Sequence, residues 1–196
     1  MLPRHVSAPG LAERCPRCLL LHRVCVCAEI PRISTRTRIV IVRHVAERWR
    51  SSNSGRAAAL ALDNCEVLDH GDRDAPLDES VLTGTGTWLV FPEGPPRTSA
   101  PSPPPERLII LDATWQQARR MRRRLTSLRG LPVLRLPDEP APAARLRHSP
   151  GHGMVSTIEA IARALRIVEG EEPAAALERL FDLLVARAQA SGRRAP

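Results

Sequence analysis

The most informative segment for the fold class of this chain is Leu108-Ile109-Ile110-Leu111-Asp112-Ala113-Thr114-Trp115-Gln116-Gln117-Ala118-Arg119-Arg120-Met121. Its four leading apolar residues predict a buried strand, and Thr114 can cap a helix that we expect to extend to about Arg129. In open α/β sheets, ligands bind outside the carboxyl ends of the strands. Asp112 therefore stands where a reacting group would be placed, with arginines on the helix that follows.

Further strands and helices alternate along the rest of the sequence. We expect strands over residues 38–42, 66–69, 87–91 and 132–136, and helices over residues 54–62, 157–169 and 173–190. This alternation predicts an α/β domain with a mainly parallel sheet flanked by helices. We divide the chain into an N-terminal element (1–30), the α/β domain (31–190) and a disordered tail (191–196).

The charge of the chain points to a polyanionic partner. Its 196 residues suffice for one domain, and 29 basic residues, all of them arginine, outnumber 21 acidic ones to give a net charge of +8. High-GC coding explains arginine in place of lysine, but not the excess of positive charge or its clustering. We therefore expect nucleic acid ahead of a membrane surface as the partner.

Neither a membrane span nor a signal peptide is expected. No apolar run approaches the roughly 20 residues that a membrane helix needs. Only scattered apolar residues precede the first cysteine. We expect a cytoplasmic protein with no membrane partner. We favour a monomer, although the sequence does not determine the oligomeric state.

Four cysteines stand close together near the N-terminus, as Cys15-x-x-Cys18 and Cys25-x-Cys27. Paired thiolates on tight turns are the ligands of structural tetrahedral zinc, and four of them leave no open position for chemistry. We predict a structural Zn²⁺ site, with an iron–sulfur cluster, a disulfide pair or unliganded thiols as the alternatives.

Two further segments carry candidate ligand contacts. Ser156-Thr157-Ile158-Glu159 opens a helix as a capping box, which alone would explain it, but a helix N-terminus is also an anion site. Phe91-Pro92 ends a strand, either as a simple terminator or beside a ligand. A dinucleotide fingerprint is not found, because Gly84-x-Gly86 lacks the third glycine and precedes a strand.

Asp112-Ala113-Thr114-Trp115 resembles the Asp-x-Thr-Trp signature of the DTW-domain family, and the cysteine cluster, Phe91-Pro92 and Ser156 to Ala160 match further family motifs in the same order. Arg43-His44 with Asn53-Ser54 is similar to another family segment, with Ser54 where threonine is usual. Ala113 replaces a frequent glycine. The resemblance implies a SPOUT-like fold in residues 31–190. It also implies transfer of the 3-amino-3-carboxypropyl group of S-adenosylmethionine to N3 of a uridine in tRNA.

The resemblance also implies roles for individual residues. Asp112 would take the N3 proton, in a catalytic segment that also includes Thr114 and Trp115. From the residues alone, Asp112 could instead be a helix cap or an ion-pair partner of arginine. Trp115 could instead be a residue of the hydrophobic core. The cofactor site would comprise Phe91, Pro92, Leu111, Ser156, Thr157, Ile158 and Glu159.

Basic residues on the strand ends, the arginine-rich helix and the loop before the last two helices are the candidate RNA contacts. Arginine binds phosphate bidentately, although a charge run is usually a solvated face. These residues are Arg43, His44, Arg119, Arg120, Arg123, Arg145 and Arg147.

Two other functions remain compatible with the sequence. One is a SPOUT-type RNA methyltransferase that uses S-adenosylmethionine, which would release a different coproduct. The other is a non-catalytic zinc-bearing RNA-binding protein, which would not bind the cofactor. Cytidine-deaminase chemistry is excluded, because no His-x-Glu accompanies the cysteines.

Overall fold

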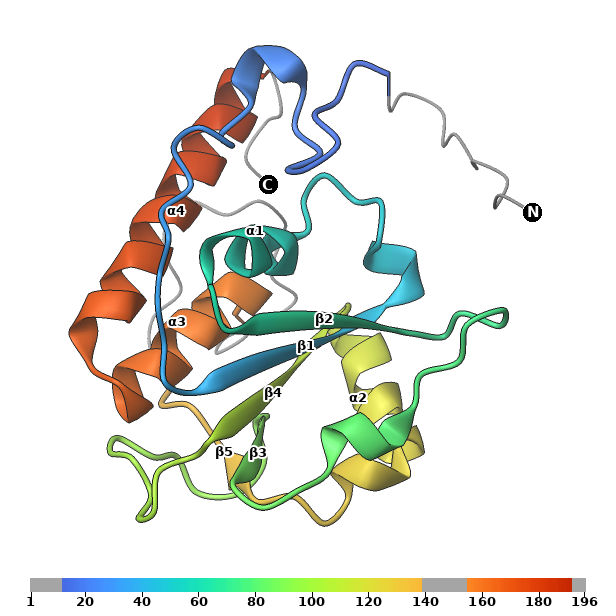
Figure 1. Ribbon diagram of the computed structural model, residues 1–196, viewed down its shortest axis with the longest axis vertical. Coiled ribbons are helices and arrows are strands. Elements are labelled where there is room, and N and C mark those ends of the chain that lie inside the picture. The colour runs from blue at the N-terminus through green and yellow to red at the C-terminus, as the bar shows by residue number, and fades with distance from the viewer. Residues whose placement is uncertain (1–11, 139–154, 192–196) are drawn as a thin grey trace.

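The structure, a computed structural model, describes residues 12–138 and 155–191 and contains a five-stranded sheet (Figure 1). All strands are parallel, in the order β2-β1-β4-β3-β5. Their bounds are β1 (Arg38–His44), β2 (Cys65–His70), β3 (Thr87–Val90), β4 (Arg107–Asp112) and β5 (Val133–Leu134). The predicted α/β fold with a parallel sheet is confirmed.

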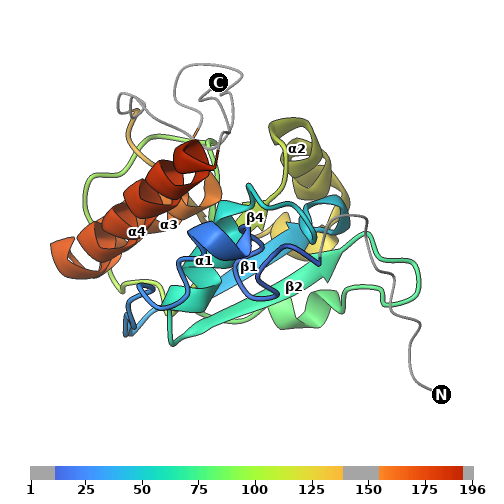
Figure 2. The same ribbon diagram turned by 90° about the horizontal axis from the view of Figure 1, so that it is seen from above.

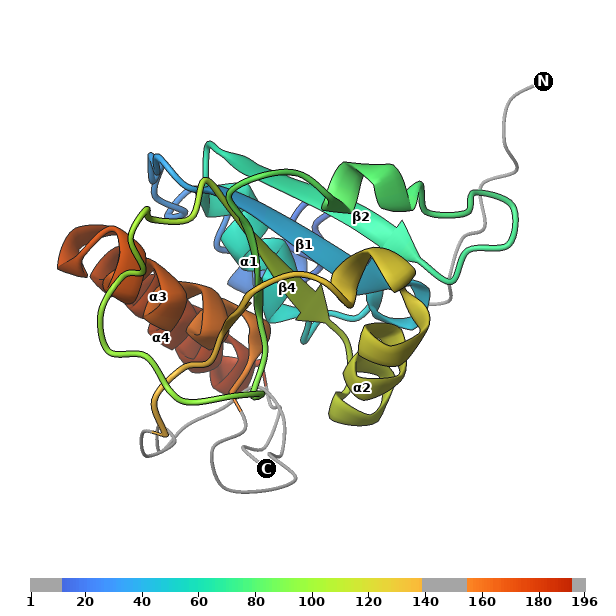
Figure 3. The same cartoon turned by 90° about the horizontal axis from the view of Figure 1, so that it is seen from below.

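Helices cover both faces of this sheet. They are α1 (Ser54–Ala61), α2 (Trp115–Arg124), α3 (Thr157–Val168) and α4 (Glu171–Ala190), with short 3₁₀ turns η1 (His22–Val24), η2 (Val45–Glu47), η3 (Glu79–Leu82) and η4 (Thr126–Leu128). Figures 2 and 3 show α3 and α4 side by side at one side of the sheet and α2 at the other. Among the described residues, no helix combines the length and apolarity that a membrane crossing requires.

The alternation of side chains along β1 divides the core into two layers. Ile39 and Ile41 join the layer with α1, α3 and α4, whereas Val40 and Val42 join the layer with α2 and η4. All four are essentially unexposed because helices cover both faces, which explains why the strand is a continuous apolar run.

The cysteine-bearing segment packs into the first of these layers. Leu20, Val24 and Val26 are buried in the same cluster as the inner residues of β1 and α4. The proposed division of the chain after residue 30 stays a prediction, but the apolar side chains before and after that point share one core.

The arginine-rich helix is shorter than the sequence predicts. α2 ends at Arg124, and a separate turn begins at Thr126. The Glu79 carboxylate accepts hydrogen bonds from the Ser127 amide (2.9 Å) and the Thr126 hydroxyl (3.1 Å). This contact across 48 residues stabilises a new helical start that a local pattern does not reveal.

Candidate functional site

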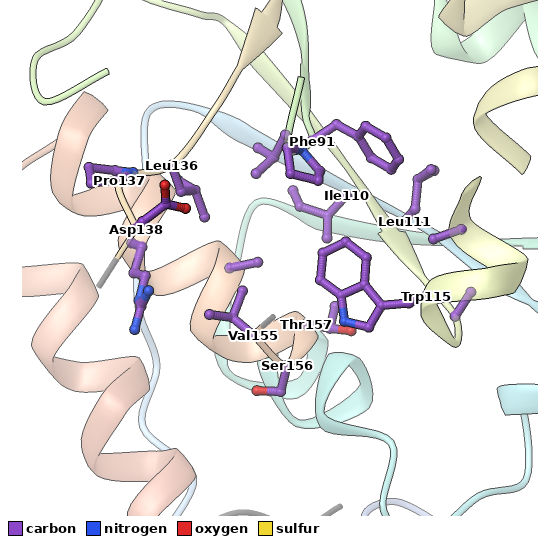
Figure 4. A pocket seen from close by; sticks show the side chains of 16 residues that line it. Phe91, Ile110, Leu111, Trp115, Leu136, Pro137, Asp138, Val155, Ser156 and Thr157 are labelled. Carbon is purple, nitrogen blue, oxygen red and sulfur yellow. The ribbon is translucent and has the colours of Figure 1, made fainter. Parts of the chain in front are cut away.

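A cavity of about 760 Å³, its open mouth included, lies at the carboxyl ends of β3, β4 and β5 (Figure 4). Five of the seven predicted cofactor residues line it: Phe91 and Pro92 follow β3, Leu111 is the last residue but one of β4, and Ser156 and Thr157 open α3. The remaining lining residues are Val90, Ile110, Ala113, Trp115, Ala118, Leu136, Pro137, Asp138, Val155, Ala160 and Arg163.

Asp112 lies buried behind this cavity rather than among the residues that line it. Its carboxylate accepts a hydrogen bond from Asn53 Nδ2 at 2.5 Å and another from Thr157 Oγ1 at 2.6 Å. Thr157 lines the cavity, so its hydroxyl stands between the cavity and the Asp112 carboxylate. The site thus holds a buried carboxylate with a hydroxyl as its contact to the ligand space.

Burial raises the pKa of Asp112, and the hydrogen bonds from Asn53 and Thr157 oppose that rise without cancelling it. Two nearby charges act in opposite directions, since Glu47 raises this pKa and Arg43 lowers it. A carboxylate whose pKa is raised is a stronger base than an exposed aspartate.

Tight packing against α1 fixes the position of Asp112. A Cβ atom added at Gly55 would lie 2.9 Å from Asp112 Cγ and Oδ2. Asn53 caps α1 through Oδ1, which accepts from the Arg56 amide at 2.7 Å, while its amide group donates to Asp112. One side chain therefore begins the helix and holds the carboxylate.

The start of α3 is a capping box, as the sequence predicts. The Ser156 amide donates to Glu159 Oε2 at 2.7 Å, and the Ser156 hydroxyl accepts from the Glu159 amide at 3.5 Å. Ile158 is fully buried and its amide donates to the Ser54 hydroxyl at 3.3 Å. Ile158 and Glu159 thus support the helix start, and neither is among the described residues that line the cavity.

The start of α2 brings Trp115 to the cavity. Thr114 caps the helix, with its amide donating to Gln117 Oε1 at 3.0 Å and its hydroxyl accepting from the Gln117 amide at 3.4 Å. Figure 4 shows the indole of Trp115 beside Leu111 and Thr157. A flat aromatic ring at this wall can stack on a base.

Sequence reasoning missed the charged residues of the cavity, Arg163 and Asp138. A signal existed for Arg163, because Ser156, Ala160 and Arg163 follow the i, i+4, i+7 spacing of one helix face. Asp138 follows β5 by four residues, in a segment without regular secondary structure that no local motif marks. Sequence reasoning also missed Glu47, which is buried and whose charge raises the pKa of Asp112.

Two predicted RNA contacts lie on β1 with different surroundings. Arg43 is paired with Asp112 in the sheet register, and its guanidinium binds Asp69 at 2.7 and 3.1 Å. His44 accepts from the Ala46 amide through Nδ1 at 3.1 Å. Both side chains therefore also stabilise the carboxyl end of β1 and the turn that follows it.

The arginines of α2 form an exposed basic surface, which we define as Arg119, Arg120, Arg123 and Arg124. Arg122 is different, because it contacts Glu93 at 3.1 Å and donates to the Leu128 carbonyl at 2.9 Å. Within the described parts of the chain, no ion pair is found for the four exposed arginines. Arg145 and Arg147 lie outside the described residues.

The four N-terminal cysteines form a cluster that could bind zinc. Their Sγ atoms all lie within 4.8 Å of one another, with Cys15 3.6 Å from Cys27 and Cys18 3.7 Å from Cys25. Tetrahedral Zn²⁺ with Zn–S bonds of about 2.3 Å places sulfurs about 3.8 Å apart, so this donor set fits the metal.

The protein surroundings shift the pKa values of the cluster's thiols in different directions. Burial opposes ionisation of Cys15, but hydrogen bonds from the backbone amides of Cys18 and Arg17 and from the neighbouring thiols together outweigh it and lower the pKa of this thiol to about 6. Burial and the neighbouring thiols raise the pKa values of Cys25 and Cys27. Cys65 lies on β2, outside the cluster, and burial raises the pKa of its thiol to about 12.

Comparison with known proteins extends these observations. Proteins named tRNA-uridine aminocarboxypropyltransferase 2 are 26% identical over 82% of this chain in Drosophila melanogaster and 30% identical over 83% in Mus musculus. The Arabidopsis thaliana protein named tRNA-uridine aminocarboxypropyltransferase A is 27% identical over 81% of the chain. The matches cover 68%, 62% and 74% of those three proteins.

No solved structure matches this chain, so the expected likeness to SPOUT folds stays a prediction. The family comparison is more specific. The DTW domain model matches residues 12–189, which include the cysteine cluster, the cavity and the Asp112 network. The chain therefore belongs to the DTW domain family.

Proposed function

We propose that this protein is a tRNA-uridine aminocarboxypropyltransferase that uses S-adenosylmethionine as donor and modifies N3 of a uridine. The observation that carries the proposal is the cavity at the carboxyl ends of β3 to β5, with the Asp112–Thr157 pair at its wall. The names of relatives across most of the chain support the reaction class.

The reaction asks little of the protein beyond alignment and removal of one proton. S-adenosylmethionine supplies a methylene carbon beside a sulfonium, which makes methylthioadenosine a good leaving group. Uridine N3 forms the new N–C bond as the C–S bond breaks, and the N3 proton must pass to a base.

Asp112 is the proposed base, and Thr157 is its contact to the substrate. The Thr157 hydroxyl donates to Asp112 at 2.6 Å and can pass that proton on while it accepts the proton from N3. The raised pKa of Asp112, which burial causes, suits it to hold that proton.

The remaining site residues would bind and orient the ligands. Phe91, Pro92 and Leu111 offer apolar contact to the cofactor, and Trp115 offers a ring on which adenine or uracil can stack. Ser156 offers a polar contact at the start of α3. Ile158 and Glu159 stabilise the start of α3, and Thr114 stabilises the start of α2, so that these side chains are held at the cavity.

The tRNA would be bound through its phosphates. The exposed arginines of α2 extend from the helix whose first residue lines the cavity, so they can hold the RNA beside the site. We propose Arg43, His44, Arg145 and Arg147 as further contacts, and Zn²⁺ in the cysteine cluster as a structural support.

Mass spectrometry of unmodified tRNA, incubated with the purified protein and S-adenosylmethionine, tests the proposal. We expect one nucleoside to gain a 3-amino-3-carboxypropyl group and methylthioadenosine to be released. A gain of a methyl group with S-adenosylhomocysteine would assign the protein to the methyltransferases. Unchanged tRNA, with no cofactor binding by calorimetry, would favour a binding protein.

Replacement of the proposed base gives a second test. Asp112→Ala should reduce product formation by about 100-fold or more, the usual contribution of a general base, and leave tRNA affinity within a few-fold. The initial rate and a filter-binding Kd measure the two effects. Undiminished turnover in this variant would remove Asp112 from the mechanism.

A further inference from the structure

The charged groups of the cavity are few and occupy defined places. Of the described residues that line it, Arg163 and Asp138 carry a charge, and the others are apolar except Trp115, Ser156 and Thr157. A charged ligand in a mainly apolar site gains most from such fixed opposite charges. The two residues therefore indicate where a zwitterionic group would be held.

The N-terminus of α3 is poorly suited to a ligand carboxylate. The Ser156 amide donates to Glu159, the Glu159 amide to the Ser156 hydroxyl, and the Ile158 amide to the Ser54 hydroxyl. Glu159 also places a carboxyl group at this helix start. A ligand carboxylate there would meet three amides that already donate within the protein and a group of like charge.

Arg163 offers a better partner from the same helix. It lies two turns after Ser156 on one face, and side chains of a helix lean toward its N-terminus, which here is the cavity. The residue is 8% exposed, so water screens its charge weakly. Its guanidinium has five donors in a planar fork, so it can bind a carboxylate bidentately and keep its other contacts in the protein.

Asp138 supplies the opposite charge. Its carboxylate is 73% exposed and lies 2.9 Å from Arg135. Figure 4 shows Asp138 at the far end of the cavity from Trp115, beside Leu136 and Pro137. An ammonium group at that end would find an acceptor, and an aromatic base would find the indole at the other end.

We propose that Arg163 binds the α-carboxylate of the amino-acid part of S-adenosylmethionine and that Asp138 accepts its α-ammonium group. This inference rests on the proposed function and names the contacts by which the site recognises the group it transfers. Because the amino-acid part is itself the group transferred, this binding also selects which of the three substituents of the sulfonium faces uridine N3.

Calorimetric binding of three related compounds tests this assignment without measuring turnover. S-adenosylmethionine carries both charged groups, decarboxylated S-adenosylmethionine lacks the carboxylate, and methylthioadenosine lacks the whole amino-acid part. The wild type should prefer S-adenosylmethionine over its decarboxylated form by roughly tenfold to a hundredfold, the contribution of a charge-assisted contact.

Arg163→Gln should abolish that preference. We expect a loss of affinity for S-adenosylmethionine of the same roughly tenfold to hundredfold size, with methylthioadenosine and the decarboxylated compound changed by less than about threefold. Arg163→Lys, which keeps the charge but loses the fork, should retain part of the preference. Arg166→Gln is the matched control on the same helix, because Arg166 binds Glu171 and Glu178 and does not line the cavity.

Two results would overturn the assignment. Equal affinity of the wild type for the two sulfonium compounds would show that the carboxylate is not recognised, even if a variant failed to fold. An equal loss for all three compounds in Arg163→Gln would show a general structural role. Both results leave adenosyl binding by the wild type intact, whereas a wild type that binds none of the three would refute the proposed function as well.

Discussion

The carboxyl group of Asp112 is held from two sides by residues that lie far from it in the sequence. Asn53 precedes it by 59 positions and Thr157 follows it by 45. Both donate hydrogen bonds to it, and burial still raises its pKa. The energetic balance at this residue is therefore set by desolvation, which the two hydrogen bonds only partly offset.

The raised pKa predicts how Asp112 depends on pH. A folded-state pKa above the unfolded value of about 3.9 gives a stabilising contribution that is full below that pH and is lost as pH rises through the folded-state pKa. We expect the difference in unfolding free energy between the wild type and Asp112→Ala to fall across that window, and the transfer rate to rise as the base ionises. Urea denaturation and initial rates at several pH values measure these effects; a flat difference would contradict the shift.

Gly55 is predicted to be intolerant of a methyl group. Gly55→Ala places a Cβ 2.9 Å from Asp112 Cγ, and the carboxylate cannot move without stretching its bonds to Asn53 and Thr157. We expect a loss of about 1–3 kcal/mol of stability, the usual cost of overpacking, despite the better helix propensity of alanine. Gly130→Ala is the control, because its Cβ would meet no atom within 4 Å. Equal denaturation midpoints for the two variants would refute the prediction.

Helix α2 connects the cavity with the exposed basic surface. Its first residue, Trp115, lines the cavity, and its exposed arginines carry positive charge away from that wall. Arginines in the last turn also interact favourably with the helix dipole, so part of their presence has a structural reason. Salt dependence separates the two roles, since phosphate binding releases counterions.

The triple variant Arg119→Gln, Arg120→Gln, Arg123→Gln should bind tRNA more weakly and with less salt dependence. If each arginine contacts one phosphate, the slope of log Kd against log salt falls by about 2–3. Fluorescence anisotropy over a salt series measures the slope. Arg32→Gln, Arg36→Gln, Arg38→Gln is the matched control, because these arginines lie before or at the start of β1, at the opposite edge of the sheet. The same slope change in both variants would show a general charge effect.

The molecule as a whole depends on one core layer that includes the cysteine element. Cys15, Cys18 and Val26 are buried with side chains of β1, α1 and α4. The element therefore covers part of the helix layer on the α1, α3 and α4 face. A metal that holds the element closed would stabilise that face as well as the local turns.

Loss of the metal should destabilise the whole domain. Cys15→Ser removes one of the four ligands, and we expect lost zinc, a lower melting temperature and reduced solubility, because buried apolar side chains of the element become exposed. Elemental analysis and thermal denaturation measure these outcomes. Cys65→Ser, outside the cluster, should retain one zinc per chain. A wild type purified without metal would refute this prediction.

Local patterns were sufficient to predict the elements. The apolar runs of β1 and β4 predict these strands because strands covered on both faces are apolar along most of their length. The caps at Asn53, Thr114 and Ser156 are local in sequence. The cysteine spacing likewise predicts the cluster, because its ligands lie within 13 consecutive residues. These features depend on residues that are neighbours in the chain, so they could be predicted without knowledge of the fold.

The surroundings of the Asp112 carboxylate depend on the tertiary structure. The strand order brings β4 between β1 and β3, and the packing of α1 and α3 sets Asn53 and Thr157 against Asp112. The early end of α2 depends on Glu79, and the position of Arg163 at the cavity depends on how α3 meets the sheet. Each of these contacts joins segments distant in sequence, and their geometry follows from packing of the whole core rather than from any local pattern.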